Sequence, residues 1–238
     1  LMSGVLISGD YIKAEGQNGR MGSRLMAIVA EGQRGRVYLA PNQIHESIPA
    51  KVEPVWRPEG DVPARLTGGT CVPYGMTTWG DLFTPRQLRT LTTLSDLVVE
   101  VRDQVIQDAK VSGLPDDGLG LEAGGTGALA YAEALATYLA LATSRVADYG
   151  SSLATWRPKD NAMRSTMPKQ AIQMTWDYAE GSPFGSSSSG FLECATVVSK
   201  ALKLLPCNPL GVASQQSARD VTLATNRPAV VSTDPPYY

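Results

Sequence analysis

The sequence predicts a mixed fold of the α/β or α+β type, with a β-rich segment at 1–66, a mainly helical middle at 67–206 and C-terminal strands at 207–238. Three observations predict it. Short apolar runs divided by glycine and proline are typical of strands, and they fill the first segment. Leucine, valine and alanine recur at helical spacing through the middle. A β-branched apolar run near the end of the chain is typical of a buried parallel strand.

The β-rich segment contains candidate strands at three places: 5–8, 24–30 and 36–40. The last two flank residues 31–35, whose sequence EGQRG is typical of a hairpin loop. The glycine-containing stretch 16–22 is predicted to be a loop without the spacing of a phosphate-binding motif. A proline-rich connector at 49–63 then leads to the helical middle.

The first long helix is predicted over 85–111. Thr84 suits the N-cap, Pro85 suits the first helical position, and Gln87 stands where a capping box needs it. Apolar residues then recur at helical spacing: Leu88, Leu91, Leu94, Val98, Val101 and Val105. This apolar face predicts packing in a helical core.

Three more helices are expected, at 126–149, 168–180 and 191–205. The first is rich in alanine and stops at Gly150, a residue type that commonly follows helix C-termini. The glycine-rich stretch 124–127 lies at its start. Because N–H groups at a helix start attract anions, this stretch is the main alternative candidate for a cofactor-binding loop within the chain. The residues before it predict a loop, whereas a dinucleotide-binding motif requires a strand there.

The C-terminal segment is predicted to contain strands at 210–214 and 228–233. Four residues follow the second strand directly: Asp234, Pro235, Pro236 and Tyr237. The carboxyl end of a strand is where open α/β sheets bind ligands. A carboxylate and a carbonyl beside rigid prolines can accept hydrogen bonds from an amine, and the tyrosine ring can stack on a flipped-out base. The alternative is a polyproline-like tail with the same four residues.

Three stretches resemble one family: YGMTTWGDLFTPRQL at 74–88, GDYIKAEG at 9–16 and STDPPYY at 232–238. They are similar to the large adenine-specific DNA methylases of bacteria and archaea, which begin with a domain of unknown function. The resemblance runs through nearly the whole chain. It implies a Rossmann-like methyltransferase sheet, to which the C-terminal strands would belong. It also implies methyl transfer from S-adenosylmethionine to the N6 amine of adenine in double-stranded DNA.

The resemblance further implies roles for individual residues. Asp234 and the Pro235 carbonyl would hold the adenine amine, Pro236 would stiffen the turn and Tyr237 would stack on the base. Asp220 would approach the adenine of the cofactor, although an aspartate that stabilises a turn fits this position as well. The family's glycine-rich cofactor loop is expected upstream of Leu1. We therefore expect an internal fragment of a methylase that is inactive alone.

Other targets stay open, because related pockets bind other amines. N4 of cytosine and the amide of a protein glutamine are the alternatives. Asp234 favours adenine, since serine at this position is more usual for cytosine and asparagine for glutamine. A non-enzymatic module that binds DNA or a partner protein is a further alternative.

One stretch is suited to binding DNA, although the formal net charge of the chain is −2. Between 155 and 173, four cations stand against the single carboxylate of Asp160: Arg157, Lys159, Arg164 and Lys169. Clustered cations neutralise phosphates, and the nearby Trp156 and Trp176 could stack on bases. A solvated loop between helices would have the same composition. The helical middle could also contact a partner protein or brace the fold.

Metal and membrane sites are not expected. The three cysteines, Cys71, Cys194 and Cys207, are widely spaced, and His45 is the one histidine, so the ligand spacing of a zinc site is missing. Reduced cysteines in a cytoplasmic protein are the simpler interpretation. The sequence contains no apolar run long enough for a membrane span and no signal-peptide pattern.

Overall fold

The computed structural model describes residues 6–67, 69–168 and 171–205, together with residues 217 and 232. The chain divides into two units, Leu1–Lys203 and Leu204–Tyr238. All helices and strands given below belong to the first unit.

The described fold is mixed α+β. Its helices are α1 (Gly9–Gln17), α2 (Gln43–Ser47), α3 (Pro85–Val111), α4 (Ala128–Tyr149) and α5 (Phe191–Leu202), with 3-10 turns η1 (Pro49–Lys51), η2 (Val72–Tyr74) and η3 (Trp79–Leu82). Its strands are β1 (Ile28–Gly32), β2 (Gly35–Leu39), β3 (Thr155–Arg157) and β4 (Ala162–Arg164), which form two antiparallel pairs. The described ranges contain no Rossmann-like sheet. The strands predicted at 210–214 and 228–233 lie outside the described residues.

Helix α3 begins and ends where the sequence predicts. The Thr84 side chain accepts a hydrogen bond from the Gln87 N–H, and the Gln87 side chain accepts one from the Thr84 N–H. This reciprocal capping box satisfies two of the donors that a helix start leaves open, and Pro85 follows with its fixed φ. The helix runs without interruption to Val111.

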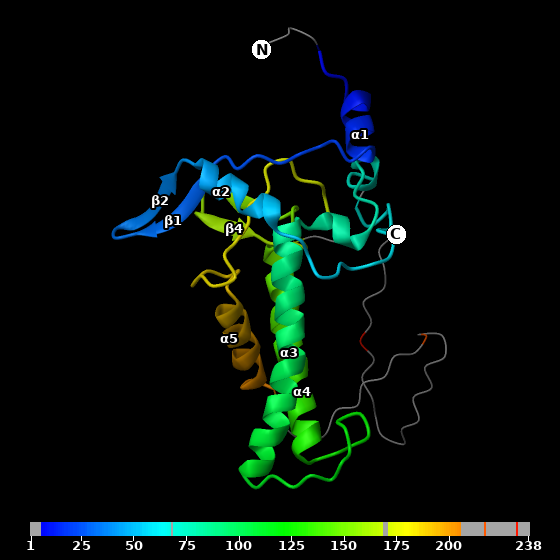
Figure 1. Ribbon diagram of the computed structural model, residues 1–238, viewed down its shortest axis with the longest axis vertical. Helices are drawn as coiled ribbons and strands as arrows, with labels where there is room; N and C mark the ends of the chain where they lie inside the picture. Colours follow the sequence, from blue (N-terminus) through cyan, green and yellow to red (C-terminus); the bar gives the residue numbers. More distant parts are fainter. Residues whose placement is uncertain (1–5, 68, 169–170, 206–216, 218–231, 233–238) are drawn as a thin grey trace. The chain divides into compact units, whose positions relative to one another are not determined.

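Helices α3 and α4 lie side by side in opposite directions, and α5 packs against α4 (Figure 1). Ala142, Val146 and Cys194 are the buried centre of this layer. Around them pack partly buried residues of α3 and α5: Leu91, Leu94, Phe191, Ala195 and Val198. The small side chains of α4 permit this close approach. Helix α5 is shorter than predicted and ends at Leu202.

The hairpin predicted around 31–35 is confirmed. Strands β1 and β2 pair in antiparallel register from Ile28 opposite Leu39 to Gly32 opposite Gly35. The turn is therefore formed by Gln33 and Arg34, and Gly35 takes a positive φ of 130°. Only β1 starts later than expected, because residues 24–27 are irregular.

The N-terminal prediction was wrong in two places. Residues 6–8 form no strand, and helix α1 occupies part of the predicted loop at 16–22. The Ser8 side chain caps this helix by accepting from the Tyr11 N–H. Gly16 is needed because the Tyr74 backbone approaches so closely that a Cβ at this position would lie 2.5 Å from the Tyr74 carbonyl oxygen. Tertiary contact with η2, which local sequence does not reveal, explains the glycine.

The helix predicted at 168–180 was also wrong for the residues described there. Residues 171–180 are irregular, with bends at 171, 176 and 177, and form hydrogen bonds with distant parts of the chain. The Ile172 N–H donates to the Leu66 carbonyl, and the Ala179 N–H donates to the Ala154 carbonyl. Ile172 thereby joins a second core, in which Val62, Cys71, Leu82 and Leu153 are buried. These long-range bonds take the place of the helix that a local pattern favours.

Of the helices in the described ranges, none combines the length and the apolar character that crossing a bilayer requires.

Candidate nucleic-acid interface

Strands β3 and β4 form a short hairpin that carries three of the four cations predicted to bind DNA. Arg157 ends β3, Lys159 lies in the turn and Arg164 ends β4; all three are exposed. The turn is closed by a hydrogen bond from the Asp160 N–H to the Arg157 carbonyl, and Asn161 takes a φ of 48°. Asparagine tolerates this left-handed conformation better than most residues. We call this element the basic hairpin, residues 155–164.

The strand register places two of these cations on one face. Thr155 pairs with Arg164, Trp156 with Met163 and Arg157 with Ala162. Because side chains alternate between faces along a strand, Arg157 and Arg164 share a face as diagonal neighbours, while Trp156 and Met163 share the other. Residues seven apart in the sequence therefore form one cationic face.

The base of the basic hairpin is buried and fixed by hydrogen bonds. Residues 151–154 are all buried. The Ser152 N–H and hydroxyl both donate to the Leu82 carbonyl, at 2.9 and 2.8 Å. After β4, the Thr166 N–H donates to the Asp148 carbonyl at the end of α4. The hairpin is thus held by η3 before β3 and by the end of α4 after β4.

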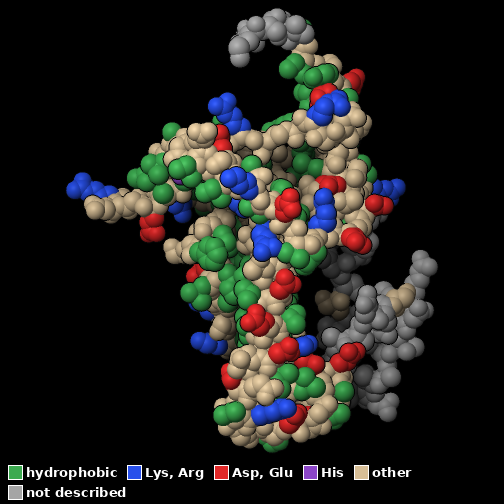
Figure 2. Space-filling view, in the orientation of Figure 1, with side chains coloured by type: hydrophobic (Ala, Val, Ile, Leu, Met, Phe, Trp, Pro, Cys, Tyr) green, Lys and Arg blue, Asp and Glu red, His purple; other side chains and the backbone are tan. Residues whose placement is uncertain are grey.

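Strand β2 contacts the basic hairpin through two side chains. The Arg36 guanidinium lies over the Trp156 ring, 5.4 Å from its centroid. The Tyr38 hydroxyl donates to the Asn161 side-chain oxygen at 2.9 Å. In Figure 1 the two hairpins lie next to each other, and Figure 2 shows Lys and Arg side chains at the outer tip of β1–β2. Sequence reasoning missed both contacts, since no local pattern links residues so far apart.

The charges of the basic hairpin are only partly compensated. Arg157 forms an ion pair with Asp160 at 3.2 Å, with both side chains about half exposed. Within the described residues, neither Lys159 nor Arg164 forms an ion pair. Lys169, the fourth predicted cation, lies outside the described residues. Two uncompensated cations and one paired cation therefore face solvent together.

The two tryptophans near these cations are engaged by other residues. Arg36 covers one face of Trp156, which is half-buried. Trp176 makes an edge contact with Tyr74, with ring centroids 5.2 Å apart at 83°. Trp176 lies in a bend, not in a helix, and stays 60% exposed. Of the two rings, Trp156 has one face covered by an arginine, whereas Trp176 remains largely exposed.

The glycine-rich stretch at 124–127, the alternative candidate for a cofactor loop, donates a backbone hydrogen bond to a side chain of the chain itself. The Thr126 N–H donates to the Asp117 carboxylate at 2.8 Å, and the Leu119 N–H donates to the same carboxylate at 3.1 Å. These backbone hydrogen bonds, first from Thr126 and then from Leu119, hold the pKa of Asp117 below its usual value. A carboxylate of the chain already occupies the position where an anion would bind at the start of α4.

Asp220, Asp234, Pro235, Pro236 and Tyr237 lie outside the described residues. Among the residues that are described, no group of three or more His, Cys, Asp or Glu is placed to hold a metal ion. Cys71 and Cys194 are free and buried. Burial raises the pKa of both thiols.

Comparisons of this chain with models of protein families, with curated proteins and with solved structures give no match. The methylase resemblance therefore rests on the sequence stretches quoted above.

Proposed function

We propose that this chain is part of an S-adenosylmethionine-dependent DNA adenine N6-methyltransferase. In this proposal the basic hairpin contacts the phosphate backbone of the duplex, and the residues Asp234 to Tyr237 hold the target amine. Cytosine N4 and protein glutamine are the alternative targets of such a pocket.

The observation that carries the DNA contact is the shared face of Arg157 and Arg164. Guanidinium groups form bidentate hydrogen bonds with phosphate, and each neutralised phosphate releases counterions from the DNA. A rigid support matters because it lowers the entropy cost of binding. The buried base at 151–154 and the cover provided by Arg36 supply that support.

Duplex DNA suits this surface better than a single strand. Proteins that bind single strands combine cations with aromatic rings on which successive bases stack. Here Arg36 covers one face of Trp156, and Trp176, although 60% exposed, belongs to the segment after the basic hairpin and not to the hairpin itself. Backbone contacts of this kind position a protein on DNA without reading the sequence. We therefore assign recognition of the target base to another part of the enzyme.

The catalytic part of the proposal rests on the sequence motif. S-adenosylmethionine supplies the methyl group to the amine. The Asp234 carboxylate and the Pro235 carbonyl accept hydrogen bonds from that amine and orient it for attack. Pro236 restricts the backbone, and Tyr237 stacks on the flipped base. Catalysis of this kind depends on positioning and on the arrangement of hydrogen-bond acceptors.

Methyl transfer from labelled S-adenosylmethionine to duplex DNA tests this part in the complete enzyme. Asp234→Ala is expected to abolish transfer, because the amine loses its main acceptor, while the affinity for duplex DNA stays unchanged. Asp96→Asn, which removes an exposed carboxylate of α3, is the matched control and should keep full activity. Full activity in the Asp234→Ala variant would rule out the assignment.

A non-enzymatic DNA-binding module is the second candidate. The basic hairpin favours it, since phosphate contact by Arg157 and Arg164 needs no catalytic partner. Absence of methyl transfer in the complete protein, combined with salt-dependent DNA binding, would support this candidate instead.

A further inference from the structure

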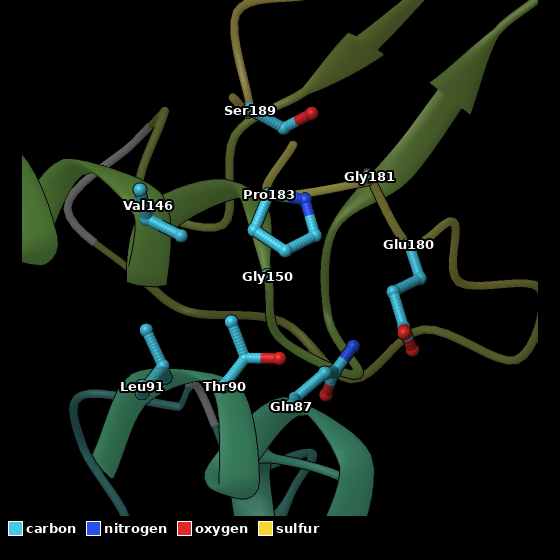
Figure 3. Close-up of a pocket in the computed structure, with 9 residues that line it drawn as sticks. All are labelled: Gln87, Thr90, Leu91, Val146, Gly150, Glu180, Gly181, Pro183 and Ser189. Carbon is cyan, nitrogen blue, oxygen red and sulfur yellow. The ribbon is translucent and has the colours of Figure 1, made fainter. Parts of the chain in front are cut away.

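A small cavity lies between the start of α3, the end of α4 and the segment 180–189, apart from the basic hairpin surface. Its volume is about 20 Å³. Figure 3 shows residues of α3 on one side and residues of the 180–189 segment on the other; the lining consists of Gln87, Thr90, Leu91, Val146, Gly150, Glu180, Gly181, Pro183 and Ser189. Leu91, Val146 and Pro183 are the apolar side chains of this lining, and Gln87, Thr90, Glu180 and Ser189 are the polar ones.

The Gln87 amide carries an unsatisfied donor at this cavity. Gln87 is only 3% exposed. Its Oε1 accepts from the Thr84 N–H at 2.8 Å as part of the capping box, which fixes the orientation of the amide because Nε2 could not accept this bond. Nε2 is buried and has no hydrogen-bond partner among the described residues. A buried donor without a hydrogen-bond partner is unfavourable, so a partner is expected.

Acceptors line the same cavity. The Glu180 carboxylate receives two hydrogen bonds from Arg86, at 2.5 and 2.9 Å, and still has lone pairs to offer. The Thr90 hydroxyl donates to the Arg86 carbonyl and so keeps its acceptor capacity. Ser189 is 2% exposed, and its hydroxyl shares one hydrogen bond with Ser187. The cavity therefore contains one unused donor together with acceptors that are not saturated.

We propose that this cavity binds one ordered water molecule. The water accepts a hydrogen bond from Gln87 Nε2 and donates to acceptors among Glu180, Thr90 and Ser189. A volume of about 20 Å³ exceeds the roughly 10–15 Å³ that one water requires, and two or more polar partners are what a buried water needs. The same volume is too small for an organic ligand, since ligand pockets are about 300–1,000 Å³.

The water links the segment 180–189 to the start of α3. This segment is packed closely, because a Cβ at Gly181 would overlap the Ser189 hydroxyl. The Arg86–Glu180 ion pair also holds the segment, through a carboxylate that lines the cavity. The segment precedes α5 and follows Tyr178, which forms an isolated bridge with Thr155 of β3, so this contact connects the helical layer with the base of the basic hairpin.

A high-resolution crystal structure of the whole chain tests the proposal directly. We expect one water peak within hydrogen-bond distance of Gln87 Nε2 and of at least one of the three acceptors. An empty cavity, or a direct hydrogen bond from Nε2 to a protein acceptor, would overturn the proposal.

Magnetic relaxation dispersion of water provides a second test in solution. Gln87→Met keeps the side-chain length but removes the donor, and it should lower the number of long-lived waters by one. Gln104→Met, a matched change at an exposed glutamine of α3, should leave that number unchanged. An unchanged number in the Gln87→Met variant would contradict the proposal, and the wild-type crystal structure decides the matter if this variant does not fold.

Discussion

The Arg36 guanidinium lies over the Trp156 ring, with its Cζ atom 5.4 Å from the ring centroid. This contact joins the hairpin β1–β2 to the basic hairpin on the face that carries Trp156. Arg157 and Arg164 are left on the opposite face, directed to solvent. We propose that Arg36 supports the basic hairpin and that Arg157 and Arg164 contact the partner.

The Arg36–Trp156 contact should be measurable as a coupling energy. We expect a double-mutant cycle with Arg36→Gln and Trp156→Leu to give about 0.5–1 kcal/mol, the usual range for an exposed cation–π pair. Urea unfolding of the four proteins supplies the numbers. Arg34→Gln in place of Arg36→Gln should show no coupling with Trp156→Leu. If the effects of Arg36→Gln and Trp156→Leu on the free energy of unfolding simply add, the two side chains do not stabilise each other.

The capping box of α3 should contribute to stability. Thr84→Ala removes the acceptor for the Gln87 N–H and should lower the free energy of unfolding by about 1 kcal/mol. Thr93→Ala, at an exposed position within the same helix, controls for helix propensity and should not destabilise. Equal effects of the two changes in thermal unfolding would show that the cap is unimportant.

Asp81 should make stability depend on pH in the acid range. Burial alone would raise the pKa of its carboxyl, but hydrogen bonds from Thr78 and Thr77 and the charge of Arg57 together hold that pKa below its usual value. Its contribution is therefore present above the unfolded carboxyl pKa of about 3.9 and is lost as the pH falls through the lower folded value.

Asp81→Asn should accordingly reduce stability at neutral pH and flatten its decrease towards acid. Urea midpoints measured from neutral to acid pH check this, with Asp96→Asn as the control carboxylate. A parallel decrease in wild type and Asp81→Asn would contradict the assignment.

The two described cysteines should react slowly with thiol reagents. Cys71 and Cys194 are fully buried, and burial raises the pKa of each thiol, so both stay protonated at neutral pH. A colorimetric disulfide reagent added to a Cys207→Ser variant should titrate no fast thiol in the native state and two after unfolding. A fast thiol in the native variant would mean that one of these sites opens readily.

The sequence predicts those elements whose signals are local. The Thr84, Pro85 and Gln87 pattern places the start of α3 correctly, and the apolar spacing that follows carries the helix to Val111. The glycines around Gln33 and Arg34 place the hairpin β1–β2. Both rely on contacts between residues a few positions apart. For the candidate site, the closeness of Arg157, Lys159 and Arg164 in the sequence is enough to predict that they form a cluster.

Long-range contacts decide the rest. Residues 171–180 form no helix, and the Leu66 and Ala154 carbonyls accept hydrogen bonds from the Ile172 and Ala179 N–H groups. Position 16 is a glycine because the Tyr74 backbone leaves no room for a Cβ. The covering of Trp156 by Arg36 belongs to the same class, since it joins residues in separate hairpins. Because local sequence patterns do not reveal this contact, the sequence prediction assigned Trp156 to base stacking.

Binding of the 238-residue chain to duplex DNA at several salt concentrations tests the central claim most directly. In the triple variant Arg157→Gln, Lys159→Gln, Arg164→Gln, we expect weaker binding and a logarithmic salt slope that is shallower by up to about 2.7, at about 0.9 for each phosphate contact. A charge-matched variant at exposed cations of α3 and α5, Arg89→Gln, Lys200→Gln, Lys203→Gln, should keep the wild-type slope. Equal affinities and slopes in wild type and the basic-hairpin variant would contradict the account.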